Sequence, residues 1–313
     1  MHNQRPTPIS QKQVAAFLSP RPKDSHKGLF GTVTVIGGAA GMVGAALLAG
    51  RAALKMGAGC VHVGLLADNA PAVDLNVPEL MVQGAVDALK SFPLPNPPPK
   101  GHPHPNPLPQ AGEGANGKGN INPRVLLIGC GLGQSLAAQK LLHDALMLDV
   151  PSVLDADALN LIALRPDLRA LLHTRKAPAV FTPHPGEAAR LLGCSTEDVQ
   201  QDRARSALSL AQKLGASVVL KGAGSLIATR DGCLYRNTSG NPGMSAPGMG
   251  DVLAGMIAAF IAQGIARDEA LLLAVHLHGA AGDALAQQQA TLGMSATEVT
   301  EWARWLLNQI APQ

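Results

Sequence analysis

Residues 241–255 (NPGMSAPGMGDVLAG) combine the residue types that phosphoryl transfer needs. Gly243, Gly248 and Gly250 free the backbone for a tight turn, and the apolar run that begins at Asp251 predicts a buried helix. A glycine-rich turn that opens a helix directs several N–H groups and the positive end of the helix dipole at one point, where an anion such as phosphate binds. Asp251 either takes a proton there from a hydroxyl group or only caps the helix.

Two further loops that follow expected strands carry charged side chains. Lys221 opens the loop 221–225 (KGAGS), where it either holds an anion or ends the strand as a solvated charge. His184 and Glu187 flank Pro185, which suits the first position of a helix. In that first turn Glu187 complements the helix dipole.

A third group of residues leaves two interpretations open. Asp155 and Asp157 follow an expected strand, where they either cap the next helix or bind Mg²⁺ through water. Residues 129–133 (GCGLG) also follow a strand, with these acids about twenty residues later, which favours a Rossmann NAD-dependent dehydrogenase. The glycines are spaced G-x-G-x-G instead of G-x-G-x-x-G, however, so this fingerprint is incomplete.

Composition narrows the class of protein. The chain has 313 residues, 46% of them hydrophobic, which suffices for a large α/β core. The net charge of +3 forms no basic stripe, so nucleic acid is not an expected partner. No apolar run approaches the ~20 residues that span a bilayer. Without CxxC or metal-ligand spacing, the four cysteines predict reduced thiols in a cytoplasmic protein: Cys60, Cys130, Cys194 and Cys233.

Strand and helix patterns alternate along the chain. The expected strands are 31–38, 60–66, 125–128, 152–154, 179–181 and 217–220, with helices at 45–56, 134–148, 157–164, 185–193 and 251–260. Ser295 and Glu298 have capping-box spacing before a C-terminal helix. This alternation predicts one α/β domain over 1–313, with a mostly parallel sheet covered by helices on both faces. Ligands bind at the carboxyl ends of such strands, where the glycine-rich loops fall.

One segment interrupts this pattern. Nine of the 24 prolines lie between Pro93 and Pro109, and Gly, Asn and Glu follow. Such a composition lacks the apolar residues that would offset its ordering entropy. We therefore expect a disordered surface insertion at about 93–120.

Seven short motifs appear in an order that resembles the ADP- or ATP-dependent NAD(P)H-hydrate dehydratase family, a branch of the ribokinase-like fold. They are HKG at 26–28, IGG at 36–38, GAG at 57–59, LDADALN at 154–160, TPHPGE at 182–187, KGAG at 221–224 and NPGM at 241–244. The resemblance runs from about Lys27 to Gln288, apart from the insertion. Each motif alone is weak, but the ordered set is specific.

The resemblance implies a repair reaction. A hydrated NADH or NADPH is phosphorylated on its added hydroxyl by ADP or ATP, and loss of phosphate then regenerates the reduced cofactor. It further implies Mg²⁺, a homotetramer in the cytoplasm and, because many members carry an epimerase domain that has no room here, a separate epimerase acting on the same substrate. The short, unfused architecture favours ADP.

The same resemblance assigns roles to individual residues. It makes Asp251 the base and gives Glu187 a role in holding Mg²⁺ through water. The amides of Gly248, Met249 and Gly250 form the expected anion hole. The nucleotide-binding residues that it implies are Lys221, Gly222, Ala223, Gly224, Ser225 and Gly250. Those implied for hydrated NAD(P)H are Ala45, Gly131, His184 and Asp251.

The chain departs from the family at Ala246 and Pro247, where members usually carry Thr or Ser followed by Gly. Proline removes a backbone donor, but the donors at 248–250 remain, so we expect the anion hole to persist. Three alternatives stay open at this point. They are a vitamin kinase of the same fold, similar to hydroxyethylthiazole kinase, the dehydrogenase described above, and a nucleotide-binding protein without turnover.

Overall fold

The computed structural model describes residues 5–92, 124–289 and 291–312, so the predicted insertion lies outside the described residues. The strands are Thr7–Pro8 (β1), Thr32–Gly37 (β2), Cys60–Leu65 (β3), Met81–Gly84 (β4), Arg124–Ile128 (β5), Ser152–Leu154 (β6), Ala179–Phe181 (β7), Ser217–Leu220 (β8), Leu226–Ala228 (β9) and Leu234–Arg236 (β10). The α-helices are Gln11–Ala15 (α1), Val43–Lys55 (α2), Ala85–Lys90 (α3), Leu136–Met147 (α4), Asp157–Leu164 (α5), Pro166–Thr174 (α6), Pro185–Leu192 (α7), Thr196–Gln201 (α8), Arg203–Leu214 (α9), Met249–Ala262 (α10), Arg267–Gln288 (α11) and Ala296–Ile310 (α12). Two 3-10 helices, Lys27–Phe30 (η1) and Pro242–Met244 (η2), complete the set.

All ten strands form one sheet in the order β1-β10-β9-β8-β7-β6-β5-β2-β3-β4. The seven strands from β8 to β4 in this order run parallel, whereas β9 is antiparallel to both β8 and β10. The expected mostly parallel α/β sheet is therefore confirmed, with a short antiparallel extension that was not predicted. The chain leaves β2 in one direction and returns at β5 on its other side, which makes a topological switch point between these two strands.

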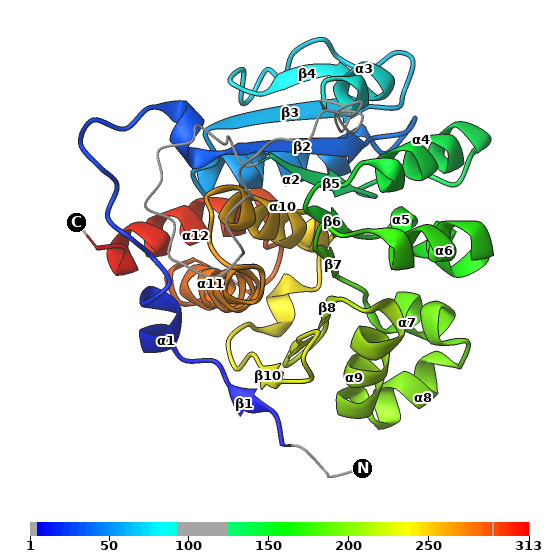
Figure 1. Cartoon of the computed structure of the whole chain (residues 1–313). Coiled ribbons are helices and arrows are strands. Elements are labelled where there is room, and N and C mark those ends of the chain that lie inside the picture. The colour runs from blue at the N-terminus through cyan, green and yellow to red at the C-terminus, as the bar shows by residue number, and fades with distance from the viewer. Residues whose placement is uncertain (1–4, 93–123, 290, 313) are drawn as a thin grey trace, which may run out of the picture.

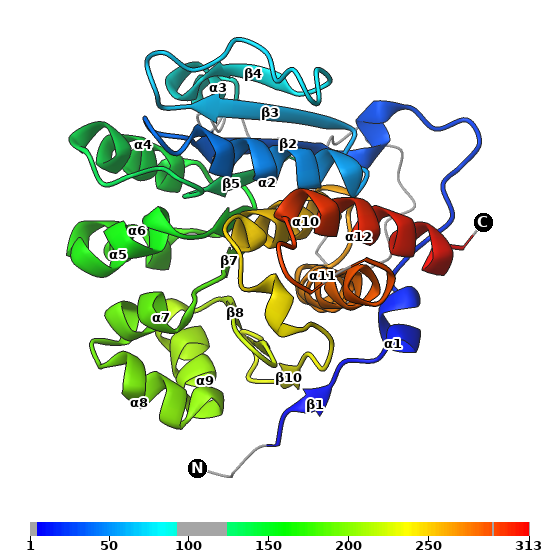
Figure 2. The same ribbon diagram turned by 180° about the vertical axis from the view of Figure 1, so that it is seen from behind.

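Helices cover both faces of the sheet, as predicted (Figures 1 and 2). One apolar cluster joins α2, α10, α11 and α12 to one face, and a second joins α3 to α9 to the other. Successive strand residues alternate between the clusters: Val125 and Leu127 face the first, Leu126 and Ile128 the second. None of the described helices combines the length and apolar character that a bilayer crossing requires.

Close packing of two helices fixes the position of α10. A Cβ at Gly255 would lie 2.1 Å from the backbone oxygen of Ala49 in α2, so only glycine allows this approach. The predicted helix at 251–260 is longer at both ends, since it begins at Met249, directly after Gly248, and ends at Ala262. This contact sets the height at which the first turn of α10 meets the carboxyl ends of the strands.

Candidate active site

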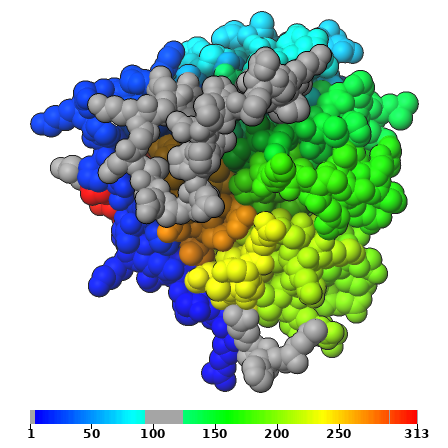
Figure 3. Space-filling model, viewed as in Figure 1, coloured from blue at the N-terminus to red at the C-terminus, as the bar shows by residue number. Residues whose placement is uncertain are grey.

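A cavity of about 830 Å³ lies where β6, β7 and β8 end. In the space-filling view, the yellow part of the chain that carries η2 and β10 reaches the surface on this side of the molecule, beside orange α11 (Figure 3). Most of the predicted site residues line this cavity: His184, Glu187, Lys221, Gly222, Ala223, Gly224, Ser225, Met249, Gly250 and Asp251. Loops far apart in the sequence therefore meet at one site.

The first turn of α10 opens onto the cavity. Gly248 precedes the helix with a φ of 86°, a left-handed conformation that favours glycine. The first helical hydrogen bond runs from the Val252 N–H to the Gly248 oxygen, so the N–H groups of residues 249–251 lie ahead of the helical ladder. Asp251 is the third residue of α10, and its interpretation as the N-cap is wrong.

Lys221 and Asp155 form an ion pair inside the cavity. The Lys221 Nζ lies 2.7 Å from Asp155 Oδ1, which also accepts a hydrogen bond from Thr182 Oγ1 at 2.7 Å. The side chain of Asp155 is 1% exposed and that of Lys221 is 17% exposed, so Lys221 is not a solvated strand-end charge. Lys221 follows the carboxyl end of β8 and provides a fixed positive charge next to Gly250. A Cβ on Gly250 would lie 3.1 Å from the Lys221 Nζ.

The prediction that Asp155 and Asp157 cap α5 is also wrong. The cap position belongs to Ala156, which makes no side-chain capping bond. Asp157 instead accepts a hydrogen bond of 2.8 Å from the N–H of Gly133, and Asp155 accepts one from the Lys221 ammonium. Asp157 thus holds the glycine-rich loop 129–133 through one of its carboxylate oxygens.

The turn between the two acids is strained. Ala156 has φ 48° and ψ −116°, and among the described residues it is the one non-glycine residue with positive φ. Such a conformation costs of order 1–3 kcal/mol. We expect Ala156→Gly to raise the free energy of unfolding by about 1 kcal/mol, because the relief of strain exceeds the extra entropy of glycine in the unfolded chain. Chemical denaturation measures this change, and a loss of stability would contradict the strain.

Charge and burial together perturb the carboxyl groups that face Lys221. Burial, with a contribution from the nearby Asp155, raises the pKa of Asp251 from 3.8 to about 6. Burial also raises the pKa of Glu187 to about 7, although the Lys221 charge opposes it. Burial alone would lower the pKa of Lys221, but the carboxylates of Asp155 and Glu187 outweigh it and raise that pKa. The Lys221 ammonium therefore lies among acids whose protonation changes near neutral pH.

His184 and Glu187 form a capping box at the start of α7, a pairing that the sequence analysis did not foresee. The Nδ1 of His184 accepts hydrogen bonds from the N–H groups of Gly186 (3.0 Å) and Glu187 (3.4 Å), while Glu187 Oε2 accepts one from the His184 N–H (2.8 Å). The second ring nitrogen, Nε2, lies 3.3 Å from Glu187 Oε1, so it carries the proton. Burial and the charge of Lys221 lower the pKa of His184, which favours the neutral ring.

The acids at this site suit Mg²⁺ in one particular way. Magnesium prefers oxygen ligands and usually keeps several of its waters. Asp155, Glu187 and Asp251 supply carboxylate oxygens to the cavity. Both oxygens of Glu187 already contact His184, and Asp155 pairs with Lys221. These residues therefore fit a Mg²⁺ ion that they would hold through water.

Three of the predicted residues do not line the cavity: Ala45, Gly131 and Gly248. Gly131 is buried against α2, since a Cβ there would lie 2.6 Å from the Met42 oxygen and 3.1 Å from the Cβ of Ala45. Gly248 packs on Leu48 in the same way, at 2.6 Å. Ala45 and Gly131 nevertheless adjoin the switch point between β2 and β5, because the N–H of Ala39 bonds to the Gly131 oxygen.

Two further ionisable side chains in the cavity were missed by the sequence analysis. His278 lies in the middle of α11, and burial together with the charge of Lys221 lowers its pKa to about 4. Its Nε2 atom is buried without a hydrogen-bond partner among the described residues. Arg236 ends β10 at the rim. A histidine inside an apolar helix and an arginine at the end of a short strand form no sequence motif that would indicate a site.

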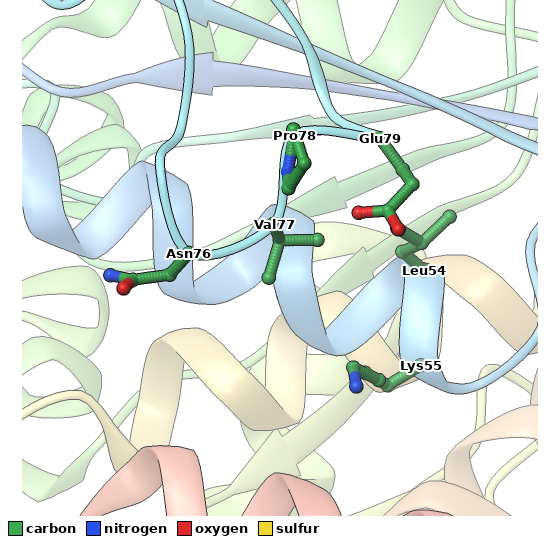
Figure 4. A pocket seen from close by; sticks show the side chains of 6 residues that line it. All are labelled: Leu54, Lys55, Asn76, Val77, Pro78 and Glu79. Atoms are coloured by element: carbon green, nitrogen blue, oxygen red, sulfur yellow. The ribbon is translucent and has the colours of Figure 1, made fainter.

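A second cavity, of about 350 Å³, lies between the end of α2 and the loop at residues 76–79 (Figure 4). Its charged side chains are Lys55 and Glu79, and Lys55 also pairs with Glu301 at 2.8 Å. Because Glu79 is the one acid among the described residues of this lining, the cavity offers no pair of carboxylates for acid–base chemistry. The chemistry belongs to the larger cavity.

Similar proteins match this chain along most of its length. A protein from Neisseria meningitidis serogroup B, named ADP-dependent (S)-NAD(P)H-hydrate dehydratase, is 40% identical over 93% of this chain and 89% of its own length. The bifunctional NAD(P)H-hydrate repair enzyme Nnr of Escherichia coli is 38% identical over 96% of this chain. The chain spans about half of that enzyme's length, 52%.

Solved structures agree in fold. The ADP/ATP-dependent NAD(P)H-hydrate dehydratase of Bacillus subtilis, co-crystallised with ATP and Mg²⁺, superposes with a TM-score of 0.78 at 29% identity, over 97% of this chain and 98% of that one. A ribokinase-like superfamily protein of Enterococcus faecalis gives 0.77 at 27% identity, over 99% and 98%. The family model described as NAD(P)H-hydrate dehydratase matches residues 33–304. The chain therefore belongs to the NAD(P)H-hydrate dehydratase family, and its fold is ribokinase-like.

Proposed function

We propose that Asp251 is the base in a nucleotide-dependent dehydration of hydrated NADH or NADPH. One observation carries the proposal: the partly buried Asp251 carboxyl, the open N–H groups of α10 and the Lys221 ammonium face the same cavity. Asp251 removes the proton of the added hydroxyl, and the oxygen attacks the terminal phosphorus of ADP or ATP. The bond from that phosphorus to the nucleotide's bridging oxygen breaks as the new P–O bond forms.

The second stage is loss of the phosphate. Cleavage of the bond between the ring carbon and its oxygen releases phosphate with the bonding electrons, and loss of a proton from the neighbouring ring carbon restores the double bond of the reduced nicotinamide. The N–H groups of residues 249–251 and the charge of Lys221 stabilise the negative charge on the moving phosphoryl group. Mg²⁺, held through water by Glu187, would neutralise further phosphate charge.

The two ligands occupy different sides of Asp251 in this proposal. The nucleotide lies over residues 221–225 and Gly250. The dinucleotide substrate extends from His184 past Asp251 to Ala45 and Gly131, at the switch point where ligands of parallel sheets bind. The Neisseria relative is named for ADP and the Bacillus structure for both nucleotides, and we propose ADP for this chain.

Recovery of reduced-nicotinamide absorbance tests the function. Hydrated NADH, Mg²⁺ and the protein are mixed with ADP or with ATP, and phosphate is assayed in parallel. We expect absorbance to return with a nucleotide only, with one phosphate released for each NADH formed. A stable phosphorylated product would indicate a kinase instead, and no change with either nucleotide would refute the proposal.

Activity should depend on the protonation of Asp251. Because its pKa is raised to about 6, we expect kcat to fall as the pH drops through that value.

The stability of the protein should change with pH in the opposite direction. The proton binds the folded protein more tightly than the unfolded chain, so the contribution of Asp251 to stability is full below 3.8 and is lost as the pH rises through about 6. Steady-state rates and thermal midpoints over this range measure both effects.

Asp251→Asn is the control for this pH dependence. The variant should lose the fall in thermal midpoint that Asp251 causes between pH 3.8 and about 6. If kcat of the wild type stays flat down to pH 4, the assignment of the base is wrong. The homotetramer, the cytoplasmic location and the separate epimerase stay predictions.

A further inference from the structure

Arg236 holds a position over the loop that we assign to the nucleotide. It is the last residue of β10 and lines the large cavity. Its Nε and Nη2 atoms lie 2.9 and 3.2 Å from the point that a Cβ on Gly224 would occupy. Gly224 has a φ of 62°, so glycine both allows this conformation and leaves room for the guanidinium.

A second arginine, Arg203 of α9, packs against the same loop and has a structural role. Arg203 Nη1 lies 2.7 Å from the Cβ position of Gly222. Arg203 donates to the backbone oxygens of Leu220 (3.2 Å) and Lys221 (3.3 Å), so its guanidinium braces the loop. The side chain of Arg236 makes no hydrogen bond or ion pair with any residue that the structure describes. Its donors remain free to bind a ligand.

Positive charge predominates around this loop. The guanidinium groups of Arg203 and Arg236 pack against the same loop, at Gly222 and Gly224, so their like charges oppose each other. Burial and the charge of Arg236 accordingly lower the pKa of Arg203. Asp155, an acid of the same cavity, already forms an ion pair with Lys221. An anion at Arg236 would offset the repulsion, and the planar fork of a guanidinium matches two phosphate oxygens.

The position along the loop indicates which part of the nucleotide Arg236 meets. Lys221 lies at the Gly250 end, where the phosphoryl group must be transferred, and Gly224 lies three residues further along. We propose that Arg236 binds a phosphate group of the nucleotide that is not transferred, and that it thereby selects phosphorylated over unphosphorylated nucleosides. This inference rests on the proposed nucleotide role of residues 221–225.

Equilibrium binding to the full chain, without hydrated cofactor, tests the inference. Arg236→Met keeps an apolar stem and removes the charge, Arg236→Lys keeps the charge without the fork, and Arg230→Met changes an exposed arginine that does not line the cavity. Calorimetry with ADP and with adenosine gives each Kd. We expect Arg236→Met to weaken ADP about tenfold, since hydrogen bonds to charged groups have this size. Adenosine binding should stay unchanged.

The other variants complete the comparison. Arg236→Lys should fall between wild type and Arg236→Met, and Arg230→Met should match wild type. Unchanged ADP affinity in Arg236→Met would overturn the inference. Equal weakening of ADP and adenosine would place Arg236 at the base or ribose and overturn it as well. If the wild-type chain binds no ADP, the proposed nucleotide site itself is wrong, and this inference falls with it.

Discussion

Asp251→Asn should lower kcat by at least ~10²-fold, the lower end of general acid–base contributions. The substitution keeps the size of the side chain but removes its negative charge and its capacity to accept a proton. Because the pKa of Asp251 is raised by burial, the folded protein keeps a charge there only at a cost above about pH 6. We therefore expect an unchanged or higher thermal midpoint at pH 7. Affinity for ADP should be kept or slightly raised, since a negative charge near the terminal phosphate is gone.

Three measurements on one preparation separate catalysis from folding: kcat, thermal midpoint and Kd for ADP. Asp24→Asn, an exposed aspartate that does not line the cavity, is a matched control and should behave as wild type. A structural role for Asp251 would give the opposite pattern, with a lower midpoint and a normal rate. Turnover of Asp251→Asn near the wild-type value would remove the base from the proposed reaction.

Lys221→Met should destabilise the protein and abolish tight nucleotide binding. Removal of one partner from a buried ion pair typically costs about 3–5 kcal/mol, and we expect the lower end because Lys221 is 17% exposed. The loss follows from leaving the carboxylate of Asp155, 1% exposed, with the Thr182 hydroxyl as its one remaining side-chain donor among the residues that the structure describes. The pKa values of Glu187 and Asp251 should rise further, since the Lys221 charge lowers both.

A double variant distinguishes this mechanism from simple loss of packing. Asp155→Asn combined with Lys221→Met removes both charges, so stability should largely return while ADP binding stays weak. Urea denaturation of the four proteins of the cycle gives the coupling. If Lys221→Met alone costs less than about 0.5 kcal/mol, as a surface substitution does, the pair behaves as a solvated one.

The periodic part of the fold was predictable because apolar strands and glycine-rich loops alternate along the chain. The strands at 152–154, 179–181 and 217–220 have the predicted bounds, since each is a short apolar run between turn signals. The helix at 134–148 begins later, at Leu136, because Ser135 caps it through the N–H of Ala138. Strands β9 and β10, which also have three residues each, were missed because the glycine and polar residues around them favour a loop.

The site was predictable where one short loop contains both glycines and a charged side chain, as at 221–225 and at the first turn of α10. It was not predictable where a side chain acquires its role from a distant partner. Asp155 and Lys221 are 66 residues apart, and nothing local shows that they pair. His278 and Arg236 likewise reach the cavity only through the packing of α11 and the antiparallel end of the sheet.

The central claim is that the added hydroxyl oxygen leaves as part of phosphate. A heavy-oxygen label placed in that hydroxyl of hydrated NADH tests it directly. After complete conversion with ADP and Mg²⁺, mass spectrometry of the released phosphate should show one labelled oxygen in each molecule, because the oxygen attacks phosphorus before its bond to carbon breaks. Label recovered in water instead, with unlabelled phosphate, would mean direct elimination of water and would contradict phosphorylation by way of Asp251.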